Sequence, residues 1–264
     1  MHKRLVITAI AVSFGAARLA SAAAVEFAAA GFDPSAIQSS VDGFRAALGA
    51  NNGIGGTFPD GRREINWDGV PDAVAAPNRM PANFFNANSK RGVVFFTPGS
   101  GFEISAKTGN PTATPVEFGD ISPNLPHVFQ TFSPQRLFTA LDSTVTEVLF
   151  FIPGTNIPAT VDGFGSVFTG VKHDGSTRIE YFDVNGTLLH SQDVPQQPWY
   201  APGLSFAGTT FTAGERVYLV RITSGSVELG SDGGIVPRSR RGEPVDVVVM
   251  DDFIYAEPQT LDLD

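Results

Sequence analysis

Short segments in which apolar and polar residues alternate run through the chain from Arg63 onward. Most have the length of a β-strand and are rich in Val, Ile, Phe and Tyr, with Gly, Pro, Asn and Asp between them. Because no helical segments separate them, they predict an all-β chain, an antiparallel β-sandwich of jelly-roll type. The expected strands lie near residues 63–67, 92–97, 102–105, 116–118, 127–132, 136–139, 146–152, 164–171, 177–183, 187–191, 204–207, 215–223, 226–229 and 246–255.

The last of these segments, Val245–Tyr255, joins an unbroken apolar run to two adjacent carboxylates. The run extends from Val247 to Met250 and is followed directly by Asp251 and Asp252. An apolar run of this kind predicts a buried, central strand. Neighbouring side chains on a strand point to opposite faces unless a bulge intervenes, so we expect one Asp to be buried and the other to be hydrated.

One α-helix is predicted ahead of the strands and docked on them. Asp33 is a favourable N-cap, Pro34 suits the first helical position, and Gly49 provides a stop. We therefore divide the chain into an N-terminal helix and loop (25–60), a β-sandwich domain (61–258) and an acidic C-terminal tail (259–264). The apolar residues on one helix face are Ile37, Val41, Phe44 and Leu48.

Residues 1–24 have the features of a secretory signal peptide. Lys3 and Arg4 precede an apolar segment, and Ala20-Ser21-Ala22 forms a small-residue cleavage site, with a cut after Ala24 as the alternative. The apolar segment is shorter than the roughly 20 residues of a membrane-spanning helix. The sequence thus predicts a secreted protein, extracellular or periplasmic, with no membrane span after removal of the signal peptide.

Removal of this segment makes an acidic chain more acidic. The full chain has 18 basic and 27 acidic residues and a net charge of −9. Residues 1–24 contain Lys3, Arg4 and Arg18 and no acid, so the remaining chain has a charge of −12. This balance argues against nucleic acid and anionic membranes as partners. The chain has no cysteine, which excludes thiol catalysis and disulfides, so stability is expected from the core or from metal.

No catalytic motif is present in the sequence. It contains no G-x-S-x-G, P-loop or H-E-x-x-H motif, and His127, His173 and His190 are not at metal-ligand spacing. We interpret these histidines as ordinary strand or loop residues and the protein as a non-enzyme. A hydrolase that uses paired carboxylates is the less favoured alternative, because its activity depends on a separation that the sequence does not define.

Four acidic residues are candidate calcium ligands. Asp251 and Asp252 form the pair on the last strand, while Asp162 and Asp174 lie in glycine-rich turns whose carbonyl groups could add further oxygens. Calcium takes six to eight oxygen ligands, and no EF-hand loop is present, so the site would have to be assembled from distant loops. The alternative is that one Asp of the pair binds turn amides and the other is hydrated.

A loop with two aromatic residues is the candidate ligand-binding site. Trp199 and Tyr200 lie in the segment Pro195–Pro202, whose prolines exclude a central strand. Flat rings on a stiff loop suit stacking against a sugar, and the neighbouring Gln side chains can bond hydroxyl groups. The alternative is that both rings pack over an end of the sandwich.

Several blocks of sequence carry a resemblance to known proteins. The blocks Gly61–Asp72, Arg91–Phe102, Val161–Phe168, Ile179–Asp183 and Val248–Tyr255 resemble a group of exported bacterial proteins of uncharacterised function. The last block is also similar in type to the closing strand of jelly-roll adhesion and carbohydrate-binding modules. This resemblance implies a β-sandwich and brings no catalytic or ligand residues with it.

These features together favour a secreted, non-catalytic module that binds an extracellular glycan or cell-surface polymer, with calcium as an additional stabilising ligand. The competing interpretation is a structural or matrix protein that makes only protein–protein contacts. The two differ in a measurable way, because the second requires an apolar surface patch or concentration-dependent assembly.

Overall fold

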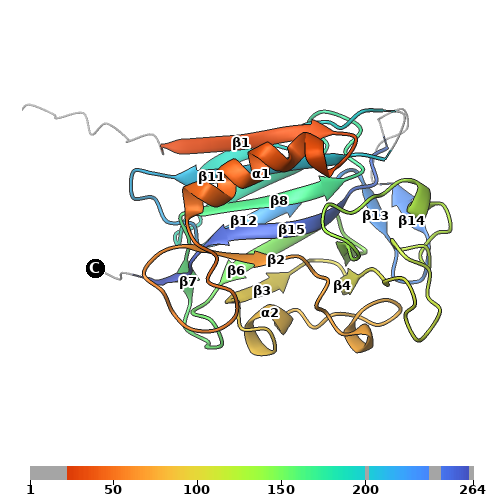
Figure 1. The fold of residues 1–264 in the computed structure, drawn as a ribbon, viewed down its shortest axis with the longest axis horizontal. Coiled ribbons are helices and arrows are strands. Elements are labelled where there is room, and N and C mark those ends of the chain that lie inside the picture. Colours follow the sequence, from red (N-terminus) through yellow and green to blue (C-terminus); the bar gives the residue numbers. More distant parts are fainter. Residues whose placement is uncertain (1–22, 200–201, 238–244, 262–264) are drawn as a thin grey trace, which may run out of the picture.

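The computed structural model describes residues 23–199, 202–237 and 245–261 (Figure 1). Residues 1–22 of the expected signal peptide and residues 262–264 of the expected tail lie outside these ranges. The helices are α1 (Pro34–Leu48) and α2 (Phe84–Ala87), with short 3-10 helices at Asp72–Val74 and Leu125–His127. The strands are β1 (Ala24–Gly31), β2 (Arg62–Ile65), β3 (Val93–Phe96), β4 (Gly101–Ile104), β5 (Phe138–Leu141), β6 (Val145–Phe150), β7 (Ala159–Thr160), β8 (Gly163–Thr169), β9 (Arg178–Phe182), β10 (Leu188–Asp193), β11 (Leu204–Phe211), β12 (Leu219–Thr223), β13 (Val227–Leu229), β14 (Ile235–Pro237), β15 (Val249–Ala256) and β16 (Gln259–Thr260).

Two large sheets contain most of these strands. The larger has the order β1-β11-β8-β15-β5-β13-β14, with β2 beside β15 and β4 beside β5. The smaller has the order β10-β9-β12-β6-β3. The pairs are antiparallel except for β13, which lies parallel to β5, so the larger sheet is mixed. The prediction of a mostly β fold with few helices is confirmed.

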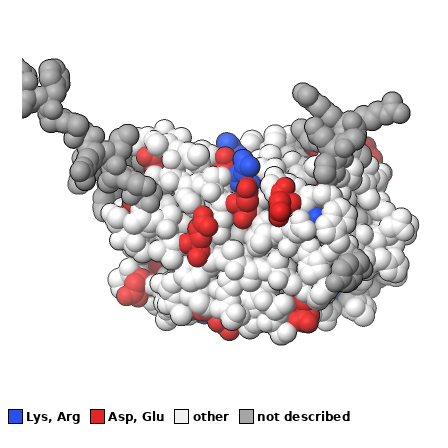
Figure 2. Space-filling view, turned by 90° about the horizontal axis from the view of Figure 1, so that it is seen from above, with Lys and Arg blue, Asp and Glu red and all other residues white. Residues whose placement is uncertain are grey.

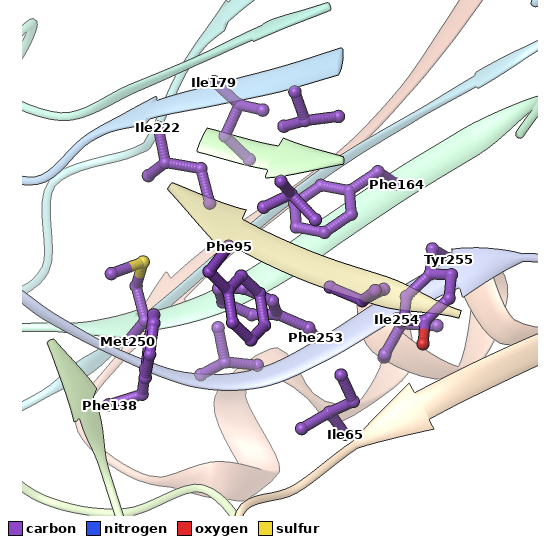
Figure 3. Close-up of a cluster of buried hydrophobic side chains, with 14 of the residues drawn as sticks. Ile65, Phe95, Phe138, Phe164, Ile179, Ile222, Met250, Phe253, Ile254 and Tyr255 are labelled. Carbon is purple, nitrogen blue, oxygen red and sulfur yellow. The ribbon is translucent and has the colours of Figure 1, made fainter. Parts of the chain in front are cut away.

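The core lies between the two sheets and is rich in aromatic rings (Figure 3). Phe253 of β15 lies 5.2 Å from Phe164 of β8, ring centre to ring centre. Ile179 and Ile222 of the smaller sheet belong to the same cluster of buried side chains. Every residue of β15 is buried, which explains the almost continuous apolar run in this strand. The prediction of a central last strand is therefore confirmed.

Helix α1 begins and ends as predicted and covers the outer side of the larger sheet (Figure 1). Asp33 caps it by accepting hydrogen bonds from the backbone N–H groups of Ser35 and Ala36. Phe44 from its buried face lies on the sheet where Gly165 and Gly208 are paired. A Cβ atom at Gly165 would lie 3.0 Å from the Phe44 ring, so this position must be glycine for the helix to approach so closely.

Four parts of the chain differ from the prediction. The strand expected near residues 116–118 is absent, because Val116 forms only an isolated bridge with Ala106 and residues 117–120 form a turn. Residues 259–260 of the expected tail form strand β16, which pairs with β7. The region 25–60 was expected to hold only a helix and a loop, but β1 precedes the helix and pairs with β11 along its whole length. Its Ala-rich sequence has a weak strand propensity, so pairing with β11 determines its structure. The strand expected at residues 127–132 is absent, because Leu125–His127 form a 3-10 helix and the backbone N–H of Phe132 bonds to Asp251 instead of a strand.

A buried ion pair connects the beginning and the end of the strand region. Arg63 of β2 and Glu257, directly after β15, are both almost fully buried, and two hydrogen bonds of 2.7 Å join them. The remaining guanidinium N–H groups of Arg63 donate to the carbonyl oxygens of Gly53, Gly55 and Gly56. All five donors are thereby used, so Arg63 fixes the glycine loop on the body of the protein.

Candidate functional site

Trp199 lies in the turn between β10 and β11, where its side chain is largely in solvent. The residue is 58% exposed, and its ring lies edge to face with the ring of His173 at a centroid distance of 4.7 Å. Tyr200, the second residue predicted for ligand binding, lies outside the described residues. The alternative that the Trp199 ring is packed over the end of the sandwich does not fit this exposure.

His173 is held in place by a buried carboxylate, Asp246. Asp246 accepts hydrogen bonds from the backbone N–H groups of Lys172 and His173, from Nδ1 of His173 at 2.9 Å and from Oγ of Ser176 at 2.5 Å. Because a carboxylate only accepts, Nδ1 of His173 donates the proton in this bond, and the ring is fixed in orientation. This arrangement presents a fixed imidazole beside the exposed indole.

The loop that carries Trp199 is anchored on its inner side. Gln197 is buried, its backbone N–H donates to the carbonyl oxygen of Val171, and its side-chain Oε1 accepts from the backbone N–H of Gly170. Lys172 Nζ donates to the carbonyl oxygen of Pro198 at 3.3 Å, and burial lowers the pKa of this lysine while Asp246 opposes that effect. We call Trp199, His173 and Lys172 the Trp199 surface.

Sequence reasoning missed two members of this cluster. It assigned His173 an ordinary loop role and treated Asp246 only as the beginning of the last strand. The two residues are 73 positions apart, so their contact depends on the fold and has no local signal in the sequence.

Asp251 and Asp252 are both buried, which corrects the expectation that one of them is hydrated. A β-bulge between Met250 and Phe253 places one extra residue in β15 relative to β8. With this bulge both side chains lie inside, at 0% and 2% exposure. Without a bulge, adjacent side chains of a strand point to opposite faces of the sheet. The bulge breaks this alternation at Asp251 and Asp252.

The acid pair is satisfied by internal groups. Asp251 accepts from the backbone N–H groups of Phe132 and Ser133, and Asp252 accepts from Oγ of Ser133 at 2.6 Å. Arg45 of α1 lies 3.5 Å from Asp252. Burial raises the pKa of both carboxyl groups, and the charge of Asp252 raises that of Asp251 further. Both shifts favour the protonated form of the carboxyl group, as in other closely spaced carboxylates.

The four predicted calcium ligands lie in different surroundings. Asp162 is about half exposed and lies 3.6 Å from Arg216, while Asp174 is exposed in the turn next to His173. Asp251 and Asp252 are enclosed between Ser133 and α1. Within residues 23–199, 202–237 and 245–261, no three acidic or histidine side chains form a group able to hold a metal ion. The structure therefore does not unite the four residues in one place.

Comparison with protein-family models, curated proteins and solved structures gives no match for this chain. In the part of the chain that the structure describes, no helix has both the length and the apolar character required to cross a membrane.

Proposed function

We propose that this protein is an exported, non-catalytic module that binds an extracellular glycan or cell-surface polymer at the Trp199 surface. The observation that carries the proposal is the 58% exposure of Trp199 on a loop whose inner side is anchored by Gln197. An indole held in this way offers a flat apolar face to a sugar ring with little loss of side-chain entropy on binding.

The polar groups beside the indole suit the hydroxyl groups of a sugar. The His173 ring is fixed by the bond from Nδ1 to Asp246, and its Nε2 is a second polar atom with which a hydroxyl group can form a hydrogen bond. Sugar recognition combines such directed hydrogen bonds with ring stacking, and the Trp199 surface supplies both.

The distribution of charge supports a partner other than a polyanion. Figure 2 shows the molecule from above the view of Figure 1, and in the described part of that face acidic side chains lie on both sides of a small basic group. A long anionic polymer requires a continuous basic surface, which this part of the face does not provide.

Three further elements belong to the proposal. The two sheets are proposed to form a sandwich of jelly-roll type, as the resemblance to exported bacterial proteins implies. Export is proposed from the signal-peptide features of residues 1–24. Calcium is proposed as a stabilising ligand of the turns that hold Asp162 and Asp174.

A glycan array followed by calorimetry with the best ligand tests the binding function. Trp199→Ala should weaken binding at least about fivefold, since stacking on an aromatic side chain contributes on the order of 1 kcal/mol or more. Phe96→Ala is the matched control, because Phe96 of β3 is a similarly exposed aromatic residue, at 54%. An array without hits, or equal affinities for the two variants, would contradict the proposal.

Thermal unfolding with calcium and with chelator, at matched ionic strength, tests the calcium element separately. A ligand that binds only the folded state adds about 2.7 kcal/mol at a hundredfold excess over its Kd. Identical melting curves would remove calcium from the proposal and leave the glycan-binding function untouched.

A further inference from the structure

A cavity of about 390 Å3 lies beside α2, apart from every residue of the Trp199 surface. Its volume falls in the range of small-molecule sites, which begins at about 300 Å3. Its walls combine aromatic rings with a few polar side chains. Among the residues that line it are Ile54, Trp67, Phe84, Phe85, Asn88 and Arg91.

The apolar part of the cavity is a cluster of rings already in mutual contact. Phe85 lies edge to face with Trp67 at 5.4 Å and with Phe84 at 5.1 Å, measured between ring centroids. Trp67 and Phe85 are buried, and Phe84 is half-buried. A further ring that entered the cavity would extend this cluster and gain both burial and ring–ring contacts.

The polar part is dominated by Arg91, whose charge is not balanced. Its guanidinium group lies over the Phe85 ring at 5.8 Å and donates through Nη1 to Oγ of Ser89. Its Nε is enclosed and has no hydrogen-bond partner, and no carboxylate lies within ion-pair distance of Arg91 among the described residues. Burial lowers the pKa of Arg91; the nearby Tyr255 opposes this effect, and the charge of Arg63 adds to it to a smaller degree.

The lack of an acidic partner distinguishes Arg91 from the other arginines in similar surroundings. Each of the other buried or half-buried arginines in the described chain has an acidic partner, in an acidic protein where partners are plentiful. A half-buried guanidinium group without an anion is costly, and an anionic ligand would relieve that cost. The paired arginines are Arg45, Arg62, Arg63, Arg136, Arg216 and Arg221.

We propose that the cavity beside α2 binds a small aromatic carboxylate, with its ring against Phe84 and Phe85 and its carboxylate on Arg91. A planar carboxylate matches the guanidinium fork, and the enclosed ring cluster selects a flat apolar body. The side chain of Asn88 at the cavity lining supplies an amide for a ring hydroxyl.

The rim of the cavity is held in position before any ligand arrives. Ile54, which is 62% exposed, lies in the glycine loop whose carbonyl oxygens are bound by Arg63. The backbone N–H of Gly55 also donates to the carbonyl oxygen of Lys90, next to Arg91. A fixed rim reduces the entropy cost of binding, and Ile54 becomes covered when the cavity fills.

The test compares 4-hydroxybenzoate with its uncharged analogue 4-hydroxybenzamide on the intact folded protein. The chain has two tryptophans, so in a Trp199→Phe background the fluorescence reports Trp67 in the cavity wall. We expect saturable quenching by the acid and at least tenfold weaker binding of the amide. Arg91→Gln should reduce affinity for the acid by at least tenfold, while Arg79→Gln, which removes an exposed arginine, should leave affinity unchanged.

Either of two results would overturn the proposal. One is equal affinity for the acid and the amide, and the other is an absence of saturable quenching at millimolar concentration. The comparison of acid with amide needs no variant at position 91, so it decides the question even if Arg91→Gln does not fold. Glycan binding at the Trp199 surface is measured with different ligands and fails or succeeds independently.

Discussion

Substitution of Asp251 tests whether the buried acid pair retains a proton at neutral pH. Asp251 is fully buried, and its carboxyl group accepts hydrogen bonds from two backbone N–H groups, those of Phe132 and Ser133. Burial and the neighbouring charge of Asp252 raise its pKa well above the ordinary value of 3.8. Asn has the same shape as a protonated Asp, whereas Ala removes the acceptor.

The two substitutions should therefore change the free energy of unfolding at pH 7 by different amounts, or in opposite directions. Asp251→Ala leaves two partly buried amides without an acceptor, at a cost of about 1–3 kcal/mol for each, so a loss of about 2–6 kcal/mol is expected. Asp251→Asn retains an acceptor for these amides and can donate to Asp252. We expect its stability at pH 7 to equal or exceed that of the unchanged protein.

The pH dependence of stability provides an independent test of whether the pKa of Asp251 is raised. A carboxyl group whose pKa is raised in the folded state binds more protons folded than unfolded, so its contribution to stability falls as pH rises from about 4 through the folded-state value. A tenfold difference in proton affinity between the folded and unfolded states is equivalent to about 1.4 kcal/mol of stability. Asp251→Asn removes this loss, so its advantage over the unchanged protein should grow from pH 4.5 to pH 7.5.

Urea unfolding midpoints at the two pH values provide the assay, with Asp174→Asn as the control. Asp174 is exposed, so this change replaces a carboxyl group by an amide in the same way without touching the core. If Asp251→Asn were as destabilised as Asp251→Ala at pH 7.5, the carboxylate would have to be ionised and stabilised in place, and the reasoning would be refuted.

Three further predictions concern other parts of the molecule. Burial, with the charge of Asp120, raises the pKa of Glu103 to about 8. In urea unfolding, Glu103→Gln should therefore be more stable than the unchanged protein by a few kcal/mol at pH 8.5 but not at pH 5. A difference in stability that is the same at both pH values would contradict this prediction. Glu257→Gln leaves the buried charge of Arg63 without its partner and should lower the free energy of unfolding by about 3–5 kcal/mol in the same assay. A decrease of less than about 1 kcal/mol would contradict this prediction. If the proposed export takes place, mass spectrometry of the mature protein should find an N-terminus at Ala23, because the backbone nitrogen of Ala23 lies 3.0 Å from the carboxylate of Glu215; a start two residues later would oppose this.

The elements that the sequence predicts well are those with strong local signals. Helix α1 has an N-cap, a first-turn proline and one apolar face, and the structure bounds it at Pro34–Leu48. The closing strand is an apolar run too long and uniform for an edge, and β15 is central. In both cases the local sequence pattern is enough to predict the element, because the contacts in the folded protein favour the same structure.

The elements that the sequence misses depend on contacts between distant residues. Strand β1 is Ala-rich and gains its structure from β11, about 180 positions later. The bulge in β15 gives no sign in the residues around Asp251 and Asp252, since the ladder with β8 defines it. The contact of His173 with Asp246 likewise requires the fold. Pairing across a sheet is a property of two segments, and a pattern along one segment does not contain it.

The two proposed binding sites also differ in how easily they can be predicted from the sequence. Trp199 is an aromatic residue between prolines, so composition alone draws attention to it. Arg91 is one arginine among many, and in an acidic chain each arginine is expected to find a carboxylate. Only a comparison of partners shows that Arg63 has all five donors satisfied while Arg91 retains an enclosed, unused Nε. An unbalanced charge beside a ring-lined cavity is a more specific indication of a ligand than an exposed ring, because it defines both the charge and the shape that the ligand must have.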